Sequence, residues 1–344
     1  MNRFDWVDAR TASQTSGLAT ATVADAMITQ AGEQALEQGS VIKAGGLDLL
    51  DLMKEDLVRP RRVVNLRTAT GLDSIIEDND GALRIGSLAT LAQVGAHPLV
   101  RERYSALADA AGKSASPQIR HMATLGGNLL QRPRCWYFRS SHHHCVRKGG
   151  QSCFAFAGEN RYHAIFDHDG CAIVHPSTAA TALVALGAQV ELVTAGAIKR
   201  EVLLENFFLL PKADIHREND LKPGEILTAI LLPPMRSAVR SVHLKQVEKG
   251  SFDWPLADVA VVLDLSADGI CHRASIVLGA AAPVPHRAKA AEAMLVGRPV
   301  NEEAAQAAGR AALDGAAPLT KNAYKLPIFE ALVRRAIVAA MSRA

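Results

Sequence analysis

Four of the five cysteines in this 344-residue chain lie within one short stretch of sequence: Cys135, Cys145, Cys153 and Cys171. This clustering constrains the fold, because thiols that bind one inorganic centre must be brought together in space. Nine, seven and seventeen residues separate them, which matches neither the close cysteine pairs of structural zinc sites nor the cysteine run of bacterial ferredoxins. The spacing leaves an iron–sulfur cluster, a structural zinc, and disulfides or unconnected thiols as alternatives.

The composition is typical of an ordinary globular protein. With 49% hydrophobic and 21% charged residues, the chain can bury substantial cores and is long enough for two or three domains. A net charge of +3 without a dense Lys/Arg block gives no reason to expect a nucleic-acid partner. No apolar run reaches the ~18 residues of a membrane span, so direct membrane insertion is not expected. The N-terminus resembles neither a Sec signal nor a twin-arginine signal.

Helical and strand-like periods alternate along the chain, which indicates a mixed architecture of helices and sheets. A helix capped by Thr22 is predicted from Val23 to about Gln38, and a helix after Ser177 is predicted to run through Leu186. Further helices are expected at 47–53, 101–112 and near the C-terminus, with strands at 41–44, 63–66, 83–85, 189–193, 226–232, 257–265 and 275–278. Pro233-Pro234 is the preferred domain boundary.

Two glycine-rich turns carry a further signal. Ala44-Gly45-Gly46-Leu47-Asp48 opens a predicted helix, and Thr124-Leu125-Gly126-Gly127-Asn128 comes shortly before Cys135. Backbone N–H groups can approach an anion closely where side chains are absent, and a helix N-terminus adds a favourable dipole. Each turn alone is also explained as a tight turn that needs glycine. Together they favour a dinucleotide whose two phosphates are held by separate loops.

These segments resemble a known family. Ala44-Gly45-Gly46-Leu47-Asp48-Leu49, the stretch from Gln118 to Leu129, His175-Pro176-Ser177 and Pro223-Gly224-Glu225 are similar to the FAD-binding subunit of molybdenum hydroxylases, the family of xanthine dehydrogenase and carbon monoxide dehydrogenase flavoproteins. The resemblance covers nearly the whole chain. The cysteine segment looks like that of the flavoprotein subunit of bacterial periplasmic aldehyde oxidoreductases.

The resemblance implies an α+β fold of the vanillyl-alcohol oxidase and carbon monoxide dehydrogenase flavoprotein type. Two FAD-binding subdomains, 1–58 and 59–234, would be followed by a C-terminal α/β domain with a small antiparallel sheet and helices, 235–344. The cysteine loop, 132–172, would be inserted in the second subdomain.

The resemblance also implies which residues contact FAD. Lys43, Ala44, Gly45, Gly46, Leu47, Asp48 and Leu49 would wrap the diphosphate, while Thr124, Gly127 and Asn128 would contact the phosphates and ribityl chain. Ser177 would contribute to the same site. Leu227 would lie against the isoalloxazine ring and Lys245 near its N1 edge. Two positions depart from the family pattern, because Leu47 stands where threonine is common and Thr178 where aspartate is common.

The resemblance further implies that Cys135, Cys145, Cys153 and Cys171 bind a [4Fe–4S] cluster, with no catalytic residue in this chain. The subunit would receive electrons from a molybdenum-cofactor large subunit through a [2Fe–2S] small subunit and pass them to an external acceptor. Basic residues around the loop, such as Arg134 and Arg147, are explained either as solvated side chains or as cations that raise the cluster potential. The complex would be periplasmic by co-export with a partner, or cytoplasmic. A self-sufficient flavin oxidase and a zinc-stabilised binding module remain as alternatives.

Overall fold

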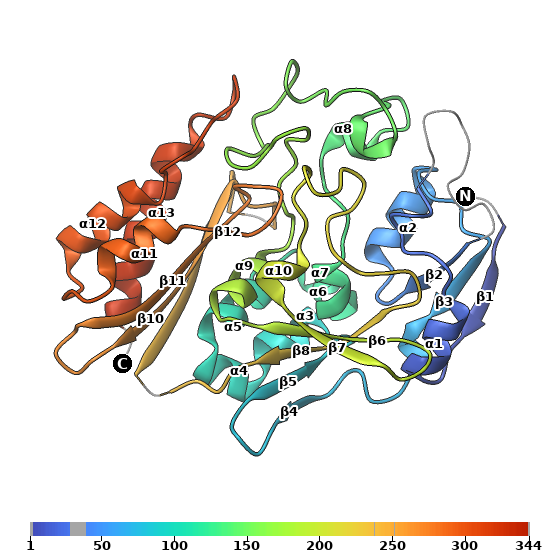
Figure 1. Ribbon diagram of the computed structural model, residues 1–344, viewed down its shortest axis with the longest axis horizontal. Helices are drawn as coiled ribbons and strands as arrows, with labels where there is room; N and C mark the ends of the chain where they lie inside the picture. The colour runs from blue at the N-terminus through green and yellow to red at the C-terminus, as the bar shows by residue number, and fades with distance from the viewer. Residues whose placement is uncertain (1–2, 28–38, 237, 251, 343–344) are drawn as a thin grey trace.

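The computed structural model describes residues 3–27, 39–236, 238–250 and 252–342. In this part of the chain three β-sheets follow one another along the sequence, each with helices packed beside it (Figure 1). The predicted α+β class is confirmed. Among the described residues, no helix is long and apolar enough to cross a bilayer.

The first sheet is parallel and small. It has the strand order β1-β3-β2, formed by β1 (Asp5–Asp8), β3 (Arg62–Asn65) and β2 (Ser40–Lys43). Three helical segments accompany it: α1 (Ala12–Leu18), α2 (Leu47–Lys54) and the 3₁₀ turn η1 (Leu66–Thr68). The predicted strand and glycine turn before α2 are confirmed. The sheet includes β3, which lies beyond residue 58, the predicted end of the first subdomain. The predicted domain limits stay a prediction.

The second sheet is antiparallel and has the order β4-β5-β8-β6-β7. Its strands are β4 (Ile75–Glu77), β5 (Leu83–Gly86), β8 (Ile226–Leu232), β6 (Gln189–Val193) and β7 (Lys199–Leu203). Its helices are α3 (Leu91–Ala96), α4 (Pro98–Arg103), α5 (Ser105–Gly112), α6 (Pro117–Met122), α7 (Leu125–Leu129), α9 (Thr178–Ala185) and α10 (Leu204–Phe207). Every residue of α9 is buried, and Ser177 caps it as predicted.

The third sheet is antiparallel with the order β12-β11-β10-β9. It comprises β12 (His286–Arg287), β11 (Cys271–Gly279), β10 (Ala257–Leu265) and β9 (Val239–Gln246), and is joined by α11 (Lys289–Leu295), α12 (Glu302–Ala311) and α13 (Lys325–Ser342). α13 packs on β9 and β10 through its apolar face, which is buried as the helical period predicts. Its buried residues include Phe329, Leu332, Val333, Ala336, Ile337 and Ala340.

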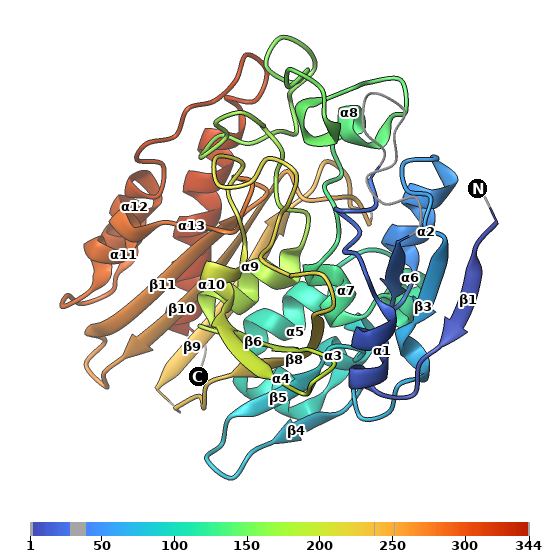
Figure 2. The same ribbon diagram turned by 45° about the vertical axis from the view of Figure 1, so that its right-hand side comes forward.

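The cysteine-bearing segment contains only two short helical pieces, α8 (Trp136–Arg139) and the 3₁₀ turn η2 (Val146–Lys148). In both views it extends from α8, near α2 beside the first sheet, towards the C-terminal helices (Figures 1 and 2). Phe138 and Cys145 pack into the apolar core that contains Leu49 and Leu52 of α2. The segment is therefore held against the helix that follows the first glycine turn.

Two helix predictions need correction. Residues 23–26 form a turn and not the start of a helix, because Thr22 and Asp25 hydrogen-bond each other reciprocally and Met27 then bridges Val58. The rest of that predicted helix, residues 28–38, lies outside the described residues. The predicted helix at 101–112 is two helices, α4 and α5, which meet at Tyr104; its hydroxyl donates to the Pro233 carbonyl at 2.8 Å.

Candidate functional site

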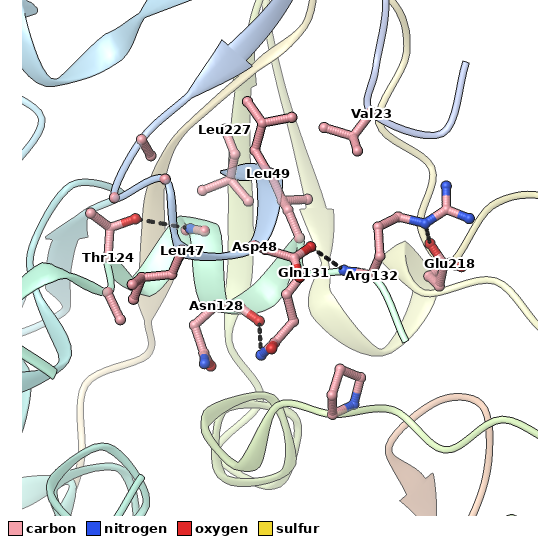
Figure 3. A pocket seen from close by; sticks show the side chains of 18 of the residues that line it. Val23, Leu47, Asp48, Leu49, Thr124, Asn128, Gln131, Arg132, Glu218 and Leu227 are labelled. Atoms are coloured by element: carbon pink, nitrogen blue, oxygen red, sulfur yellow. Dashed lines mark hydrogen bonds and ion pairs between the residues drawn. The ribbon is translucent and has the colours of Figure 1, made fainter. Parts of the chain in front are cut away.

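A cavity of about 480 Å³ lies where the two glycine turns meet, and its size is typical of small-molecule and cofactor sites. Twelve of the thirteen residues predicted to contact a cofactor line it, the exception being Ser177. Figure 3 shows Leu47, Asp48 and Leu49 of the first turn facing the same space as Thr124 and Asn128 of the second. The structure therefore brings the predicted loops together from distant parts of the sequence.

The first turn offers open backbone donors. Gly46, the N-cap of α2, has φ 86°, a left-handed conformation that favours glycine, and no side chain caps the helix. The first amides of a helix have no acceptor within the helix, so those of α2 are available to an anion. A Cβ at Gly45 would lie 2.2 Å from the Met122 carbonyl oxygen, so only glycine fits where the two turns touch. Lys43 also lines the cavity, and burial lowers its pKa.

In the second turn, backbone amides already donate hydrogen bonds to other groups of the protein. The Thr124 hydroxyl accepts the Gly127 N–H at 3.1 Å, and the Gly126 N–H donates to the Ser87 carbonyl at 2.9 Å. A Cβ at Gly126 would lie 2.8 Å from the Ser87 side chain, which explains the glycine. This turn therefore provides a rigid, close-packed wall, whereas the first turn provides the unpaired donors.

The other predicted contacts take three different positions. Ser177 lies behind the wall, where its hydroxyl donates to Asn128 Oδ1 at 2.5 Å and accepts the Ala180 N–H at 3.0 Å. Leu227 is a buried residue of β8 on the cavity wall. Lys245 Nζ donates to the Lys113 carbonyl at 2.7 Å, and burial lowers the pKa of this lysine. Thr178, at the position that departs from the family pattern, shares a 2.6 Å hydrogen bond with Ser114.

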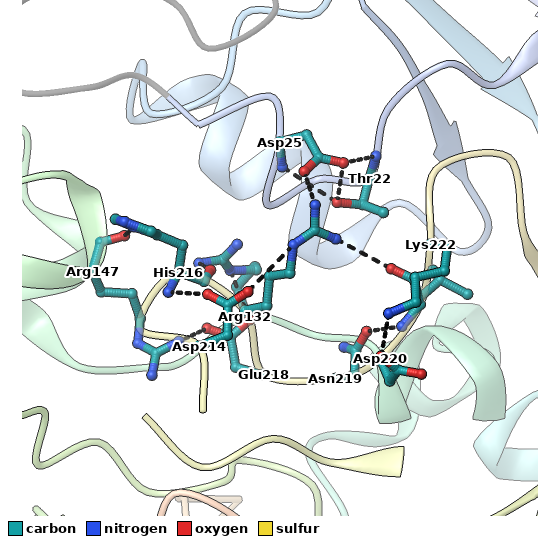
Figure 4. Close-up of polar contacts among 12 residues, drawn as sticks. Thr22, Asp25, Arg132, Arg147, Asp214, His216, Glu218, Asn219, Asp220 and Lys222 are labelled. Atoms are coloured by element: carbon teal, nitrogen blue, oxygen red, sulfur yellow. Dashed lines mark hydrogen bonds and ion pairs between the residues drawn. The ribbon is translucent and has the colours of Figure 1, made fainter. Parts of the chain in front are cut away.

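Several residues of the cavity wall were missed from the sequence. Arg132 and Arg134 line it, although they precede Cys135 and seemed to belong only to the cysteine loop. Glu218 also lines it and lies between two buried guanidinium groups, 3.0 Å from Arg132 Nε and 2.7 Å from Arg147 (Figure 4). Pro223-Gly224-Glu225, nearby in sequence, gave a signal for the wall at Glu218. Trp254 was not missed, because the sequence suggests it as a packing or pocket-rim residue; it lies at the cavity beneath Arg134, whose guanidinium is 5.1 Å from the ring centroid.

These features fit FAD. A dinucleotide needs backbone donors for its diphosphate, space without side chains beside them, and an apolar wall for its ring system. The uncapped N-terminus of α2 supplies the backbone donors, and Gly45 leaves the space beside them free of side chains. Leu227 forms part of the apolar wall. Lys43 and Lys245 add positive charge at the cavity.

The four cysteines of the cysteine segment are free of disulfides. Cys135 lies near enough to Cys145 and Cys171 for their charges to affect its titration, while burial raises its pKa to about 12. A hydrogen bond from the Cys153 side chain, together with the nearby Arg147, lowers the pKa of Cys171. Four soft sulfur donors with no carboxylate among them fit iron–sulfur clusters or zinc.

In the described part of the chain, no group of three or more His, Cys, Asp or Glu side chains forms a site that could hold a metal ion. The predicted four-thiolate centre is thus not formed as a closed ligand set. His163, which the sequence did not single out, lies 3.3 Å from Cys135 Sγ through Nε2 and is buried. Cys271, outside the cysteine segment, is a buried residue of β11.

Comparisons with known proteins agree with the fold and the cavity. Residues 11–235 match the FAD binding domain in molybdopterin dehydrogenase, and residues 242–340 match the CO dehydrogenase flavoprotein C-terminal domain. The chain is 34% identical over 290 residues, 84% of its length, to 87% of the aldehyde oxidoreductase FAD-binding subunit PaoB of Escherichia coli K12. It is 26% identical to the carbon monoxide dehydrogenase medium chain of Hydrogenophaga pseudoflava, over 87% of this chain and 88% of that one.

A solved structure of CO dehydrogenase from Oligotropha carboxidovorans superposes on 100% of this chain and 99% of its own, with a TM-score of 0.74 at 23% identity, and so shares the fold. The matched domains, the relatives and the glycine-lined cavity lead to one assignment. The chain belongs to the FAD-binding subunits of the molybdenum hydroxylases, the oxidoreductase family that includes the carbon monoxide dehydrogenase medium chains.

Proposed function

We propose that this chain is the FAD- and [4Fe–4S]-containing electron-transfer subunit of a molybdenum-dependent aldehyde oxidoreductase. The observation that carries the proposal is its 34% identity to an aldehyde oxidoreductase FAD-binding subunit. Four cysteines in the segment that follows the second glycine turn support the cluster. FAD would supply a centre that takes up two electrons one at a time, and so links one-electron donors to an external acceptor.

The residues of this chain would bind and orient the flavin. The amides at the start of α2 would hold the diphosphate, and the wall at Thr124 and Asn128 would fix the ribityl chain. Leu227 would pack on the ring system, and Lys245 would place positive charge at the ring edge. None of these side chains is required as an acid or base towards the aldehyde, whose oxidation belongs to another subunit.

The cysteine segment would hold the cluster through Cys135, Cys145, Cys153 and Cys171. Two cations support this assignment, because a four-thiolate cluster carries negative charge that must be balanced when it is buried. Arg147, which is fully buried, lowers the pKa of Cys171, and Lys148 interacts electrostatically with Cys145. The electrostatic prediction made for Arg147 thus gains a specific partner, whereas Arg134 contacts Asp48 and Trp254.

The partners would be a large subunit with the molybdenum cofactor and a small subunit with [2Fe–2S] centres. The relatives include medium chains of carbon monoxide dehydrogenase, a designation that supports an assembly of several subunits. The acceptor would reach the flavin from outside the complex. The location would follow from the partners: periplasmic by co-export, or cytoplasmic.

The proposal is tested by anaerobic reduction of the complex purified with its natural partners. An aromatic aldehyde should bleach the flavin absorption band, whereas xanthine or carbon monoxide at the same concentration should leave it unchanged. An unaltered flavin band with an aldehyde and a competent molybdenum subunit would remove the assignment to aldehyde oxidation. Bleaching by xanthine alone would give this member of the family a different substrate.

A further inference from the structure

One guanidinium group connects the cysteine segment to the first glycine turn. Arg139 is the last residue of α8, four residues after Cys135. It donates to Asp48 at 2.6 Å and to Asp51 at 2.9 Å, both on α2. It also donates to the carbonyl oxygens of Pro133 at 2.8 Å and Arg132 at 3.0 Å, immediately before Cys135. Arg139 therefore binds the helix that opens at the cavity and the backbone that positions the first cysteine.

Asp48 receives two more donors from the same segment. The Arg132 N–H donates to its Oδ2 at 2.8 Å, and Arg134 forms an ion pair with its Oδ1 at 2.9 Å. Because Asp48 is in the first turn of α2, its negative charge lies beside the amides that face the cavity. An uncompensated carboxylate there would repel a diphosphate, so the arginines of the cysteine segment improve the anion site by neutralising it.

The contact is buried enough to transmit a change between the two regions. The Arg139 side chain is only 13% exposed, and Phe138 beside it packs in the core that also contains Leu49 and Leu52 of α2. Charge-assisted hydrogen bonds from one guanidinium group to two carboxylates on the same helix restrict the orientation of the groups that they join. A displacement of the segment around Cys135 must therefore move the guanidinium away from α2.

We propose that Arg139 is a positioning residue that couples the occupancy of the cysteine centre to the affinity of the cavity for FAD. This inference rests on the proposed function, because it requires both cofactors in one chain. Binding of the cluster would fix Cys135 and α8, hold Arg139 on Asp48 and Asp51, and so strengthen FAD binding. By thermodynamic linkage, bound FAD would raise the affinity of the cysteine centre for its cluster by the same factor.

The experiment is a thermodynamic cycle on the complex purified with its partners. The FAD dissociation constant is measured by flavin fluorescence for the iron-loaded complex and after chelation that removes the iron of the cysteine centre, in the wild type and in Arg139→Met; electron paramagnetic resonance checks that the [2Fe–2S] subunit keeps its iron. Arg161→Met is the matched control, since Arg161 is in the same segment but forms a half-exposed pair with Glu248 and does not touch α2. Asp51→Asn weakens the Arg139–Asp51 ion pair from its more exposed partner. This variant replaces Arg139→Met if that variant does not fold.

In the wild type and in Arg161→Met, iron removal should weaken FAD binding about tenfold, within the usual range of such couplings. In Arg139→Met the same removal should change it by less than about twofold, and in Asp51→Asn by an intermediate factor. A merely structural role would weaken FAD binding with and without iron and leave the ratio unchanged, which would overturn the inference. A wild-type complex that contains both cofactors but shows no coupling overturns the inference alone, whereas one with no iron beyond that of the [2Fe–2S] subunit overturns the proposed cluster as well.

Discussion

Gly45 joins the two halves of the FAD cavity at a distance that no side chain permits. The close approach of its backbone to Met122 brings the uncapped end of α2 against the wall formed by the second turn. The glycine is therefore required by the neighbouring loop and not by its own backbone angles. Gly46, beside it, is required by its left-handed conformation.

Replacement of Gly45 by alanine should separate the two turns and weaken FAD binding by about fivefold to 150-fold, because overpacking of this kind costs about 1–3 kcal/mol. FAD retained by the purified complex, measured after heat release, reports the effect. Gly112→Ala is the control, since a Cβ there meets no atom within 4 Å. Equal FAD content in the two variants would show that the close approach does not matter for binding.

The residue that caps α9 also holds a side chain of the cavity wall. Ser177 closes the N-terminus of this fully buried helix and at the same time holds the Asn128 side chain. The sequence predicted the cap from the position of Ser177 after Pro176. The link to Asn128 joins residues far apart in the sequence, so local pattern could not reveal it.

Ser177→Ala should lower the free energy of unfolding by about 1 kcal/mol, the usual loss for a helix cap, and should also weaken FAD binding. Thr11→Ala removes the comparable cap of α1, where Thr11 Oγ1 accepts the Gln14 N–H at 3.0 Å. It should lower stability similarly without changing FAD affinity. Urea unfolding and flavin fluorescence titration separate the two effects; FAD binding that falls equally in both variants would contradict the role of Asn128.

Across the second sheet, Glu191 on β6 joins Thr228 on β8 to Arg84 on β5. Burial opposes its charge, but the hydrogen bonds from Arg84 and Thr228 outweigh burial and lower the pKa of Glu191 to about 2. A carboxylate with a lowered pKa in the folded state stabilises the fold above its ordinary pKa, about 4.3. That contribution is lost as the pH falls towards 2.

Glu191→Gln should therefore flatten part of the pH dependence of stability between pH 4.5 and 3. The free energy of unfolding, measured with urea at several pH values, should fall less steeply in the variant than in the wild type. Glu303→Gln, a substitution on an exposed helix position, serves as the control. Parallel curves for wild type and Glu191→Gln would contradict the assigned pKa.

At the scale of the whole molecule, the sequence predicted elements better than their assembly. Strong alternation identified β10 and the apolar face of α13, and turn chemistry identified the strand and glycine turn before α2. The Thr22 cap misled, because the same reciprocal hydrogen bonds also stabilise a turn. The order of the five-stranded sheet depends on pairings across long sequence separations, which local periodicity does not encode.

The cysteine segment is attached to the rest of the molecule on two sides. Arg139 and Phe138 attach it to α2. On the other side, Asn322 donates to the carbonyl oxygens of His163 and Ala164 at 3.0 Å each. Lys325, buried at the start of α13, donates to the His163 and Ala280 carbonyls at 3.0 and 2.8 Å. The cysteine segment therefore connects the FAD-binding part of the chain to the C-terminal part.

The most direct test of the account is a count of cofactors per chain in the complex purified anaerobically with its partners. Iron, zinc and FAD are quantified, and the reduced complex is examined by electron paramagnetic resonance, in the wild type and in Cys153→Ser. We expect one FAD per chain and four irons beyond those of the [2Fe–2S] subunit in the wild type, with these four irons and their paramagnetic signal lost in Cys153→Ser. Stoichiometric FAD without these four irons, or with zinc in their place, would contradict this expectation.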